Sequence, residues 1–154
     1  MVALITICVV ILLAAALVKR ARDRRELELH TITPEELHAL LASNRDVLVL
    51  DVRQPLDLLA DSVMIPGAKW FAPQTLLDDP SFMPARREMV LYCTCPSDET
   101  SRAVLNRALA IGFSRIKVLK GGLEGWRRNG YPVEPYQRPF PLDSGQNRRS
   151  AAAD

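Results

Sequence analysis

The sequence has few of the residues on which several classes of small protein depend. Its 154 residues include three cysteines, Cys8, Cys93 and Cys95, and two histidines, His30 and His38. An odd number of cysteines without a framework of spaced pairs argues against a disulfide-stapled secreted domain. A structural zinc ion usually needs four ligands, which the close cysteine pair could reach only with both histidines. We therefore expect no metal site.

Positive charge is scarce outside one short segment. Residues 19–25 contain five basic residues and one acidic residue, which leaves 15 basic and 17 acidic residues for the remainder of the chain. A nucleic-acid-binding protein spreads positive charge over its fold, so we expect no nucleic-acid partner. Hydrophobic residues are 48% and charged residues 25% of the chain, which is typical of one folded domain. No nucleotide or other cofactor motif is present, and we expect no cofactor.

Charged side chains are absent from the first 18 residues. A helix over residues 2–18 rises about 26 Å, at the short end of what spans a bilayer. A cleaved signal peptide carries positive charge before its apolar run and a polar region after it, and this segment has neither. We expect a transmembrane anchor at 1–19 and a basic juxtamembrane linker at 20–29. Basic residues stay inside, which predicts a cytoplasmic domain, with an anchor of opposite orientation as the alternative.

A helix start is recognisable shortly after residue 30. Thr33 can cap the helix, Pro34 suits the first helical position, and Glu36 completes a capping box with Thr33. The apolar face that follows predicts a helix that ends near Asn44.

Continuous apolar runs of strand length alternate with helical segments in the rest of the chain. Such runs are typical of strands buried on both faces of a parallel sheet. The predicted strands are 47–50, 89–92 and 116–119, and the predicted helices are 97–110, which stops at Gly112, and 123–128. This alternation predicts an α/β fold with a doubly wound open parallel sheet over residues 30–136. The polar, proline-rich residues 137–154 are expected to form a disordered tail.

Two of the predicted strands end in residues that could carry chemistry. Asp51 and Arg53 follow the first strand, and Cys93 follows the second. Ligands of open parallel sheets lie beyond the carboxyl ends of the strands. Cys93 also precedes a predicted helix, whose N-terminal N–H groups and dipole would stabilise a thiolate. Cys93 is therefore the candidate nucleophile, with a buried core cysteine as the alternative interpretation.

Several segments in this order and at this spacing resemble the rhodanese-like domain family. They are 49–55 (VLDVRQP), 65–68 (IPGA), 91–93 (LYC), 121–126 (GGLEGW) and 130–133 (GYPV). The resemblance extends over residues 31–134, and the CTCP loop that begins at Cys93 is similar to rhodanese domains attached to DedA-type membrane proteins. It implies a sulfurtransferase in which Cys93 cycles between thiolate and persulfide. With the topology predicted above, this activity would lie at the cytoplasmic face of the membrane.

The resemblance also implies roles for further residues. Backbone N–H groups of the loop would hold the negative charge of the terminal sulfur, as an oxyanion hole does. The expected substrate-binding residues are Thr94, Cys95, Ser97, Asp98, Glu99, Thr100 and Ser101. Asp51 and Arg53 match the structural motif of the family, and we expect Arg53 to pair with carboxylates. The remaining motif residues, Gly67, Gly121, Gly122 and Trp126, are expected to be architectural.

The loop departs from the usual pattern of the family, in which four residues separate the cysteine from an arginine and a serine. Here the matching serine is Ser101, the loop is about two residues longer, and Arg102 lies nine positions after Cys93. The missing arginine argues against a phosphatase, which needs it to hold phosphate. Asp98 and Glu99 would repel thiosulfate, so we expect the sulfur donor to be a persulfide carrier or a small persulfide rather than thiosulfate.

Two alternatives remain open at this point. Cys95 could resolve a persulfide or sulfenic acid on Cys93 and make the pair a redox sensor, or it could merely shape the loop. The altered loop could also belong to a non-catalytic rhodanese-like module that recruits a partner. The sequence specifies neither the sulfur acceptor nor an oligomeric state.

Overall fold

The computed structural model describes residues 2–43, 46–84, 86–94 and 98–138, with the backbone alone for 2–10, 22–24, 26–27 and 82. The chain divides into two compact units, residues 1–31 and 32–154.

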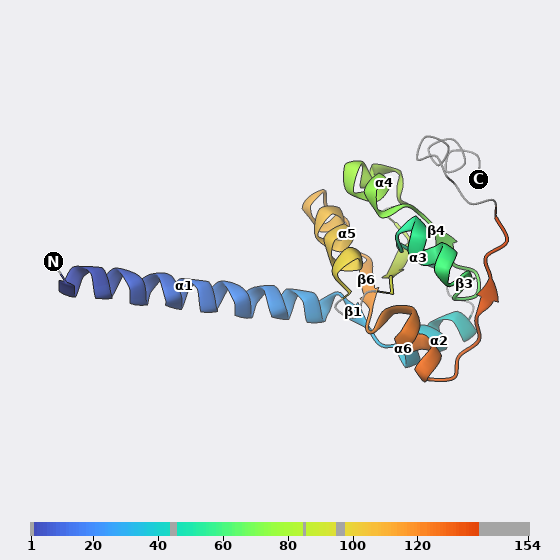
Figure 1. Ribbon diagram of the computed structural model, residues 1–154, viewed down its shortest axis with the longest axis horizontal. Helices are drawn as coiled ribbons and strands as arrows, with labels where there is room; N and C mark the ends of the chain where they lie inside the picture. The colour runs from blue at the N-terminus through green and yellow to red at the C-terminus, as the bar shows by residue number, and fades with distance from the viewer. Residues whose placement is uncertain (1, 44–45, 85, 95–97, 139–154) are drawn as a thin grey trace. The chain divides into compact units, whose positions relative to one another are not determined.

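The first unit is dominated by one helix, α1 (Val2–Leu29) (Figure 1). Among the residues that the structure describes, none of the helices has both the length and the apolar character to cross a membrane. The expected transmembrane helix is therefore unsupported by the structure. The side chains of residues 2–10, which make up half of the predicted span, lie outside those described.

The second unit is built on a five-stranded sheet with the order β1-β6-β5-β2-β4. Its strands are β1 (Thr31–Ile32), β2 (Val47–Asp51), β4 (Lys69–Trp70), β5 (Glu88–Tyr92) and β6 (Ile116–Leu119). The pairs β2–β4, β2–β5 and β5–β6 are all parallel. In the central pair, Val47 lies opposite Glu88 and Asp51 lies opposite Tyr92, so the carboxyl ends of β2 and β5 are level.

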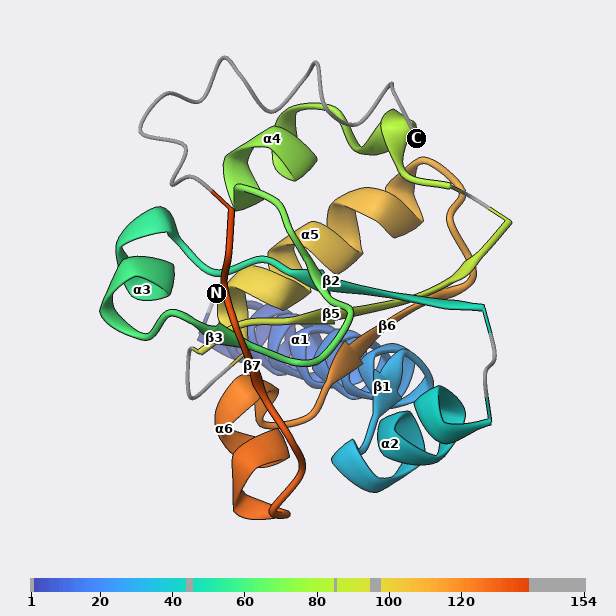
Figure 2. The ribbon, with the colours of Figure 1, turned by 90° about the vertical axis from the view of Figure 1, so that its right-hand side faces the viewer.

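Helices cover both faces of this sheet. They are α2 (Pro34–Ala42), α3 (Pro55–Ala60), α4 (Pro73–Asp78), the 3-10 helix η1 (Pro80–Phe82), α5 (Glu99–Ala110) and α6 (Gly122–Arg128). Figure 2 shows α2 and α6 on one side of the sheet, and α4 and α5 on the other. The predicted α/β fold with a parallel sheet is therefore confirmed.

The two central strands alternate between two cores. Val49 and Val90 pack in a cluster with Leu37 of α2 and Trp126 of α6. Their neighbours along the strands face the opposite way because successive side chains of a strand alternate. Of these neighbours, Leu50, Met89 and Leu91 are buried and Leu48 is partly buried. Burial on both faces explains why both strands appear in the sequence as unbroken apolar runs.

The long elements agree with the sequence prediction. The Thr33 hydroxyl accepts a hydrogen bond from the Glu36 N–H (3.3 Å), and the Thr33 N–H donates to the Glu36 carboxylate (2.8 Å), so the capping box is present. Helix α2 ends at Ala42, and Asn44 lies outside the described residues. Helix α5 begins at Glu99, two residues after the predicted start.

The short elements between β2 and β5 were not predicted. Beside α3, α4 and β4 they include β3 (Val63–Met64), which pairs antiparallel with β7 (Glu134–Pro135). This pairing ties residues near the end of the unit to the segment that follows β2.

Candidate active site

A buried carboxylate lies at the carboxyl end of β2. The Asp51 side chain accepts hydrogen bonds from Arg53 Nε (2.9 Å), Arg53 Nη2 (2.6 Å) and the Tyr92 hydroxyl (2.8 Å). It also accepts one from the Arg53 backbone N–H (3.0 Å). Asp51 and Tyr92 are 0% exposed and Arg53 is 1% exposed, so this network is closed to solvent. All these groups find their partners within the protein.

The rest of the Arg53 guanidinium is also used by the fold. Its Nη1 and Nη2 donate to the carbonyl oxygens of Asp61 (2.8 Å) and Val63 (2.7 Å). Burial opposes the charge of Arg53, but the hydrogen bonds and charge of Asp51 outweigh burial and raise the pKa of Arg53. Burial, and then the Asp51 carboxylate, raise the pKa of Tyr92, which therefore donates as a neutral phenol. Arg53 thus braces the segment after β2.

Cys93 lies at the next strand end, directly after β5, and is 0% exposed. Its carbonyl oxygen accepts a hydrogen bond from the Leu123 N–H (3.1 Å) in the first turn of α6. Gly122, at φ +53°, passes so close that a Cβ there would lie 2.0 Å from the Cys93 carbonyl oxygen. No other residue type fits without a backbone shift, so Gly122 fixes α6 against the backbone of the candidate nucleophile.

Asp98 occupies the N-cap position directly before α5, but its side chain does not cap the helix. It has a left-handed backbone (φ +52°), and its carboxylate forms no hydrogen bond with its own helix. The carboxylate instead accepts a hydrogen bond through Oδ2 from the Gly121 N–H (3.2 Å), which lies before α6. Burial raises the pKa of Asp98, although the Gly121 N–H and the charge of Arg102 oppose this increase.

Two polar atoms of this region are buried, and neither has a hydrogen-bond partner among the residues that the structure describes. They are Asp98 Oδ1, in a residue that is 7% exposed, and Ser101 Oγ, in a residue that is 0% exposed. Native proteins pair nearly all buried polar atoms, and exceptions concentrate at sites that bind ligands or water. The two atoms belong to the N-cap residue and to the first turn of α5.

The structure brings together only some of the predicted loop residues. Cys93, Asp98 and Ser101 are buried, and Thr94 and Thr100 are partly buried. Glu99 is exposed, and Cys95 and Ser97 lie outside the described residues. Arg102 is exposed on α5, so its side chain is not part of the buried region.

The other predicted motif residues lie in the framework around the site. Trp126 is 1% exposed, and its indole N–H donates to the Pro132 carbonyl (2.7 Å). Gly121 and Gly67 have positive φ, and the Gly67 N–H donates to the Glu134 carboxylate (2.9 Å).

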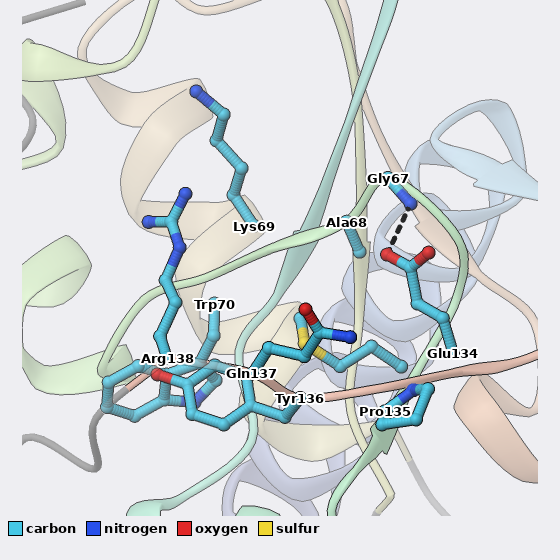
Figure 3. Close-up of a pocket in the computed structure, with 10 residues that line it drawn as sticks. Gly67, Ala68, Lys69, Trp70, Glu134, Pro135, Tyr136, Gln137 and Arg138 are labelled. Atoms are coloured by element: carbon cyan, nitrogen blue, oxygen red, sulfur yellow. Dashed lines mark hydrogen bonds between the residues drawn. The ribbon is translucent and has the colours of Figure 1, made fainter.

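A separate hollow of about 330 Å³ lies between residues 64–70 and residues 134–138. Figure 3 shows Lys69 and Arg138 pointing to the same side of this hollow, with Trp70 and Tyr136 below them. Of the residues predicted to take part in a site, only Gly67 lines it. The hollow is therefore distinct from the region around Cys93.

Tyr92 was not singled out from the sequence as a partner of Asp51 and Arg53. A signal existed, because a tyrosine in a buried strand needs a hydrogen-bond partner for its hydroxyl.

Among the described residues, no group of three histidine, cysteine, aspartate or glutamate side chains is placed to hold a metal ion.

The sequence profile of the Rhodanese-like domain matches residues 33–129. A sulfurtransferase of Allochromatium vinosum is 31% identical over 102 residues, which are 66% of this chain and 92% of that protein. The probable adenylyltransferase/sulfurtransferase MoeZ of Mycobacterium tuberculosis is 34% identical over 105 residues, which are 66% of this chain and 26% of MoeZ. The chain thus spans about a quarter of MoeZ.

Solved structures show the same fold. A full-length protein from Lactobacillus plantarum superposes with a TM-score of 0.65 at 23% identity, covering 76% of this chain and 97% of that one. A thiosulfate sulfurtransferase from Pseudomonas aeruginosa superposes with a TM-score of 0.59 at 23% identity, covering 79% of this chain and 23% of that one.

Proposed function

The chain belongs to the rhodanese-like domain family, and from this premise we propose that it transfers sulfur, with Cys93 as the residue that carries it. The observation behind this assignment is the position of Cys93, between the end of the buried strand β5 and the start of the helix α5. Both the similar sulfurtransferase and the family match cover this position.

The reaction consists of two exchanges at sulfur. The Cys93 thiolate attacks the outer sulfur of a persulfide donor, R–S–SH. The donor S–S bond breaks, R–S⁻ leaves with the bonding electron pair, and Cys93 becomes Cys93–S–SH. An acceptor thiolate then attacks the outer sulfur and releases the Cys93 thiolate. The dipole and the N–H groups at the start of α5 favour the negative charge that develops here.

The charges around the site favour a persulfide over thiosulfate as donor. Arg53 is occupied by Asp51 and two carbonyl groups, and Arg102 is exposed on α5. Neither arginine therefore offers an unpaired buried cation, whereas Asp98 brings a buried carboxylate close to Gly122 and the Cys93 backbone. A persulfide carrier or a small persulfide is the donor class that suits these charges.

Mass spectrometry tests the sulfur transfer directly. The full chain is incubated with a small alkyl persulfide, and its intact mass is measured before and after reduction. We expect a reducible gain of one sulfur, which disappears in the variant Cys93→Ser. Because Cys93 is 0% exposed, the same measurement also tests whether a donor reaches it in the folded protein.

The variant Cys95→Ser separates the two cysteines. If Cys93 carries the sulfur, this variant still gains it, and peptide mapping locates the persulfide at Cys93. A wild-type chain that gains no sulfur contradicts the proposal and leaves a recruitment module as the better explanation. A Cys93–Cys95 linkage after oxidation, without any persulfide, favours the redox sensor instead.

We further propose that the activity is located at the cytoplasmic face of a membrane. The support comes from the uncharged run at residues 2–18, the basic residues directly after it, and the similarity of the CTCP loop to DedA-attached rhodanese domains. Ile11, Leu12 and Leu17 are 60%, 69% and 67% exposed on α1, so these apolar side chains are uncovered in the isolated chain.

Cell fractionation tests this location. The full chain should stay with the membranes after an alkaline carbonate wash, whereas a variant that lacks residues 1–18 should be released into the supernatant. Recovery of the full chain in the supernatant contradicts the proposal. Protease added to cells with an intact membrane should not cut the domain, because its predicted side is cytoplasmic.

A further inference from the structure

Two acidic residues begin the helix after the Cys93 loop, and the structure places them in different surroundings. Glu99 is exposed, whereas Asp98 is 7% exposed. Water and salt screen an exposed charge strongly and a buried charge much less. Of the two carboxylates, Asp98 therefore has the stronger influence on a charged molecule that approaches Cys93.

The carboxylate of Asp98 and the backbone of Cys93 both lie close to Gly122. Its Oδ2 accepts the Gly121 N–H, and its Oδ1 has no hydrogen-bond partner in the described part of the chain. A Cβ built on Gly122 would lie 3.6 Å from Asp98 Oδ1 and 2.0 Å from the Cys93 carbonyl oxygen. The unpaired carboxylate oxygen and the Cys93 backbone thus border the same small space.

No cation among the described residues of this region neutralises Asp98 directly. The charge of Arg102 lowers the pKa of Asp98, but the Arg102 side chain is exposed, so water and salt screen it. The Gly121 N–H supplies one hydrogen bond and no net charge. Above the pKa of Asp98, the site therefore keeps a local negative charge.

We infer that Asp98 is the residue that determines donor specificity, because its buried carboxylate selects sulfur donors with at most one negative charge over dianions such as thiosulfate. The inference rests on the proposed sulfur transfer at Cys93. Thiosulfate would form the same persulfide: the Cys93 thiolate takes the outer sulfur, the S–S bond breaks, and sulfite leaves with the electron pair. The two donors thus differ in charge and leaving group, while the product on Cys93 is the same.

Electrostatic repulsion from one carboxylate is twice as large for a dianion as for a monoanion at the same distance. Removal of the charge should therefore increase the rate with both donors. The factor for thiosulfate should be the square of the factor for a monoanionic persulfide, because its repulsion energy is twice as large. We expect Asp98→Asn to increase the rate of persulfide formation about tenfold with thiosulfate and about threefold with 2-hydroxyethyl persulfide. The preference between the donors should shift about threefold toward thiosulfate.

The test compares both rates on the full chain at about pH 8, where an aspartate is normally ionised, with the intact mass as the readout. The asparagine in Asp98→Asn keeps a side-chain oxygen that can accept the Gly121 N–H. Asp98→Gly is a second variant, since glycine suits the left-handed backbone at this position. The control is Glu124→Gln, which removes one exposed charge from α6 and should leave the rate ratio unchanged.

The outcomes separate this inference from the proposed function. A shifted ratio in both Asp98 variants, with a much smaller shift in Glu99→Gln, supports the role of Asp98. An unchanged ratio in a variant that still forms the persulfide overturns the inference alone, as does an equal shift in Glu99→Gln. A wild-type chain that forms no persulfide with either donor overturns the proposed function and the inference together.

Discussion

The carboxyl ends of β2 and β5 lie next to each other, because Asp51 pairs with Tyr92 in the parallel register. At the end of β2, the Asp51 carboxylate accepts hydrogen bonds from both Arg53 and Tyr92, and all three residues are almost completely buried. At the end of β5, Asp98 Oδ1 and Ser101 Oγ are buried without a partner among the described residues.

This difference separates a structural network from a candidate site. A buried charge is tolerated when hydrogen bonds and an opposite charge compensate for lost hydration, and the end of β2 meets this condition. The end of β5 does not, and buried polar atoms without partners cost stability. Such a cost is typical of functional sites, where groups are kept ready for a ligand rather than for the fold.

The largest effect should follow from breaking the network at β2. Arg53→Met leaves the Asp51 carboxylate buried without its cation, so we expect a loss of about 3–5 kcal/mol in the free energy of unfolding. Urea denaturation of the full chain measures this loss. The double variant Asp51→Asn, Arg53→Met should recover part of it, because no charge is then left buried and unpaired. A loss below about 1 kcal/mol would mean that Arg53 does not brace the fold.

A smaller effect should follow from a methyl group at the contact between β5 and α6. Gly122→Ala places a Cβ 2.0 Å from the Cys93 carbonyl oxygen at a positive φ, so backbone strain adds to the steric clash. We expect a loss of about 2–4 kcal/mol in the free energy of unfolding, and slower sulfur loading of Cys93.

Gly130→Ala is the matched control for this variant. Gly130 has a positive φ as well (+72°), but nothing lies within 4 Å of the position that a Cβ would take there, so only the strain of about 1–2 kcal/mol remains. Equal losses in the two variants would show that the close approach of Gly122 to Cys93 contributes nothing.

The sequence was sufficient to predict the elements that are long enough to show a hydrophobic pattern. The runs at 47–50, 89–92 and 116–119 predict β2, β5 and β6 almost to the residue, since both faces of these strands are buried. The six-residue helices α3 and α4 and the two-residue strands were missed. Elements of this length show no periodicity, and contacts with distant segments, such as β3 with β7, determine them instead.

The place of Cys93 between a strand and a helix was predictable from the sequence, but the surroundings of Asp98 were not. The junction of a buried strand and a helix marks Cys93 in the sequence. The inward orientation of Asp98 could not be predicted, because it depends on a left-handed backbone and on Gly121, which lies 23 residues later. From the sequence, Asp98 and Glu99 were both expected to repel thiosulfate. In the structure only Asp98 is buried, whereas Glu99 is exposed.

The smallest effect concerns stability at the end of β5, and its size depends on pH. Burial raises the pKa of Asp98 above its ordinary value of 3.8, so the folded protein holds the proton more tightly than the unfolded chain does. The contribution of Asp98 to stability is therefore complete below the ordinary pKa and is lost as the pH rises through the raised pKa. Asp98→Asn carries no charge at any pH and avoids this loss.

We accordingly expect Asp98→Asn to have nearly the same melting temperature as the wild type in acid, and a higher one at neutral pH. Thermal unfolding between about pH 3 and pH 8 measures the difference, which should grow as the pH rises. The opposite trend, a wild type that gains stability over the variant toward neutral pH, would mean that the Gly121 hydrogen bond outweighs burial. Asp98 would then resemble Asp51 as a satisfied carboxylate, and the contrast between the two strand ends would disappear.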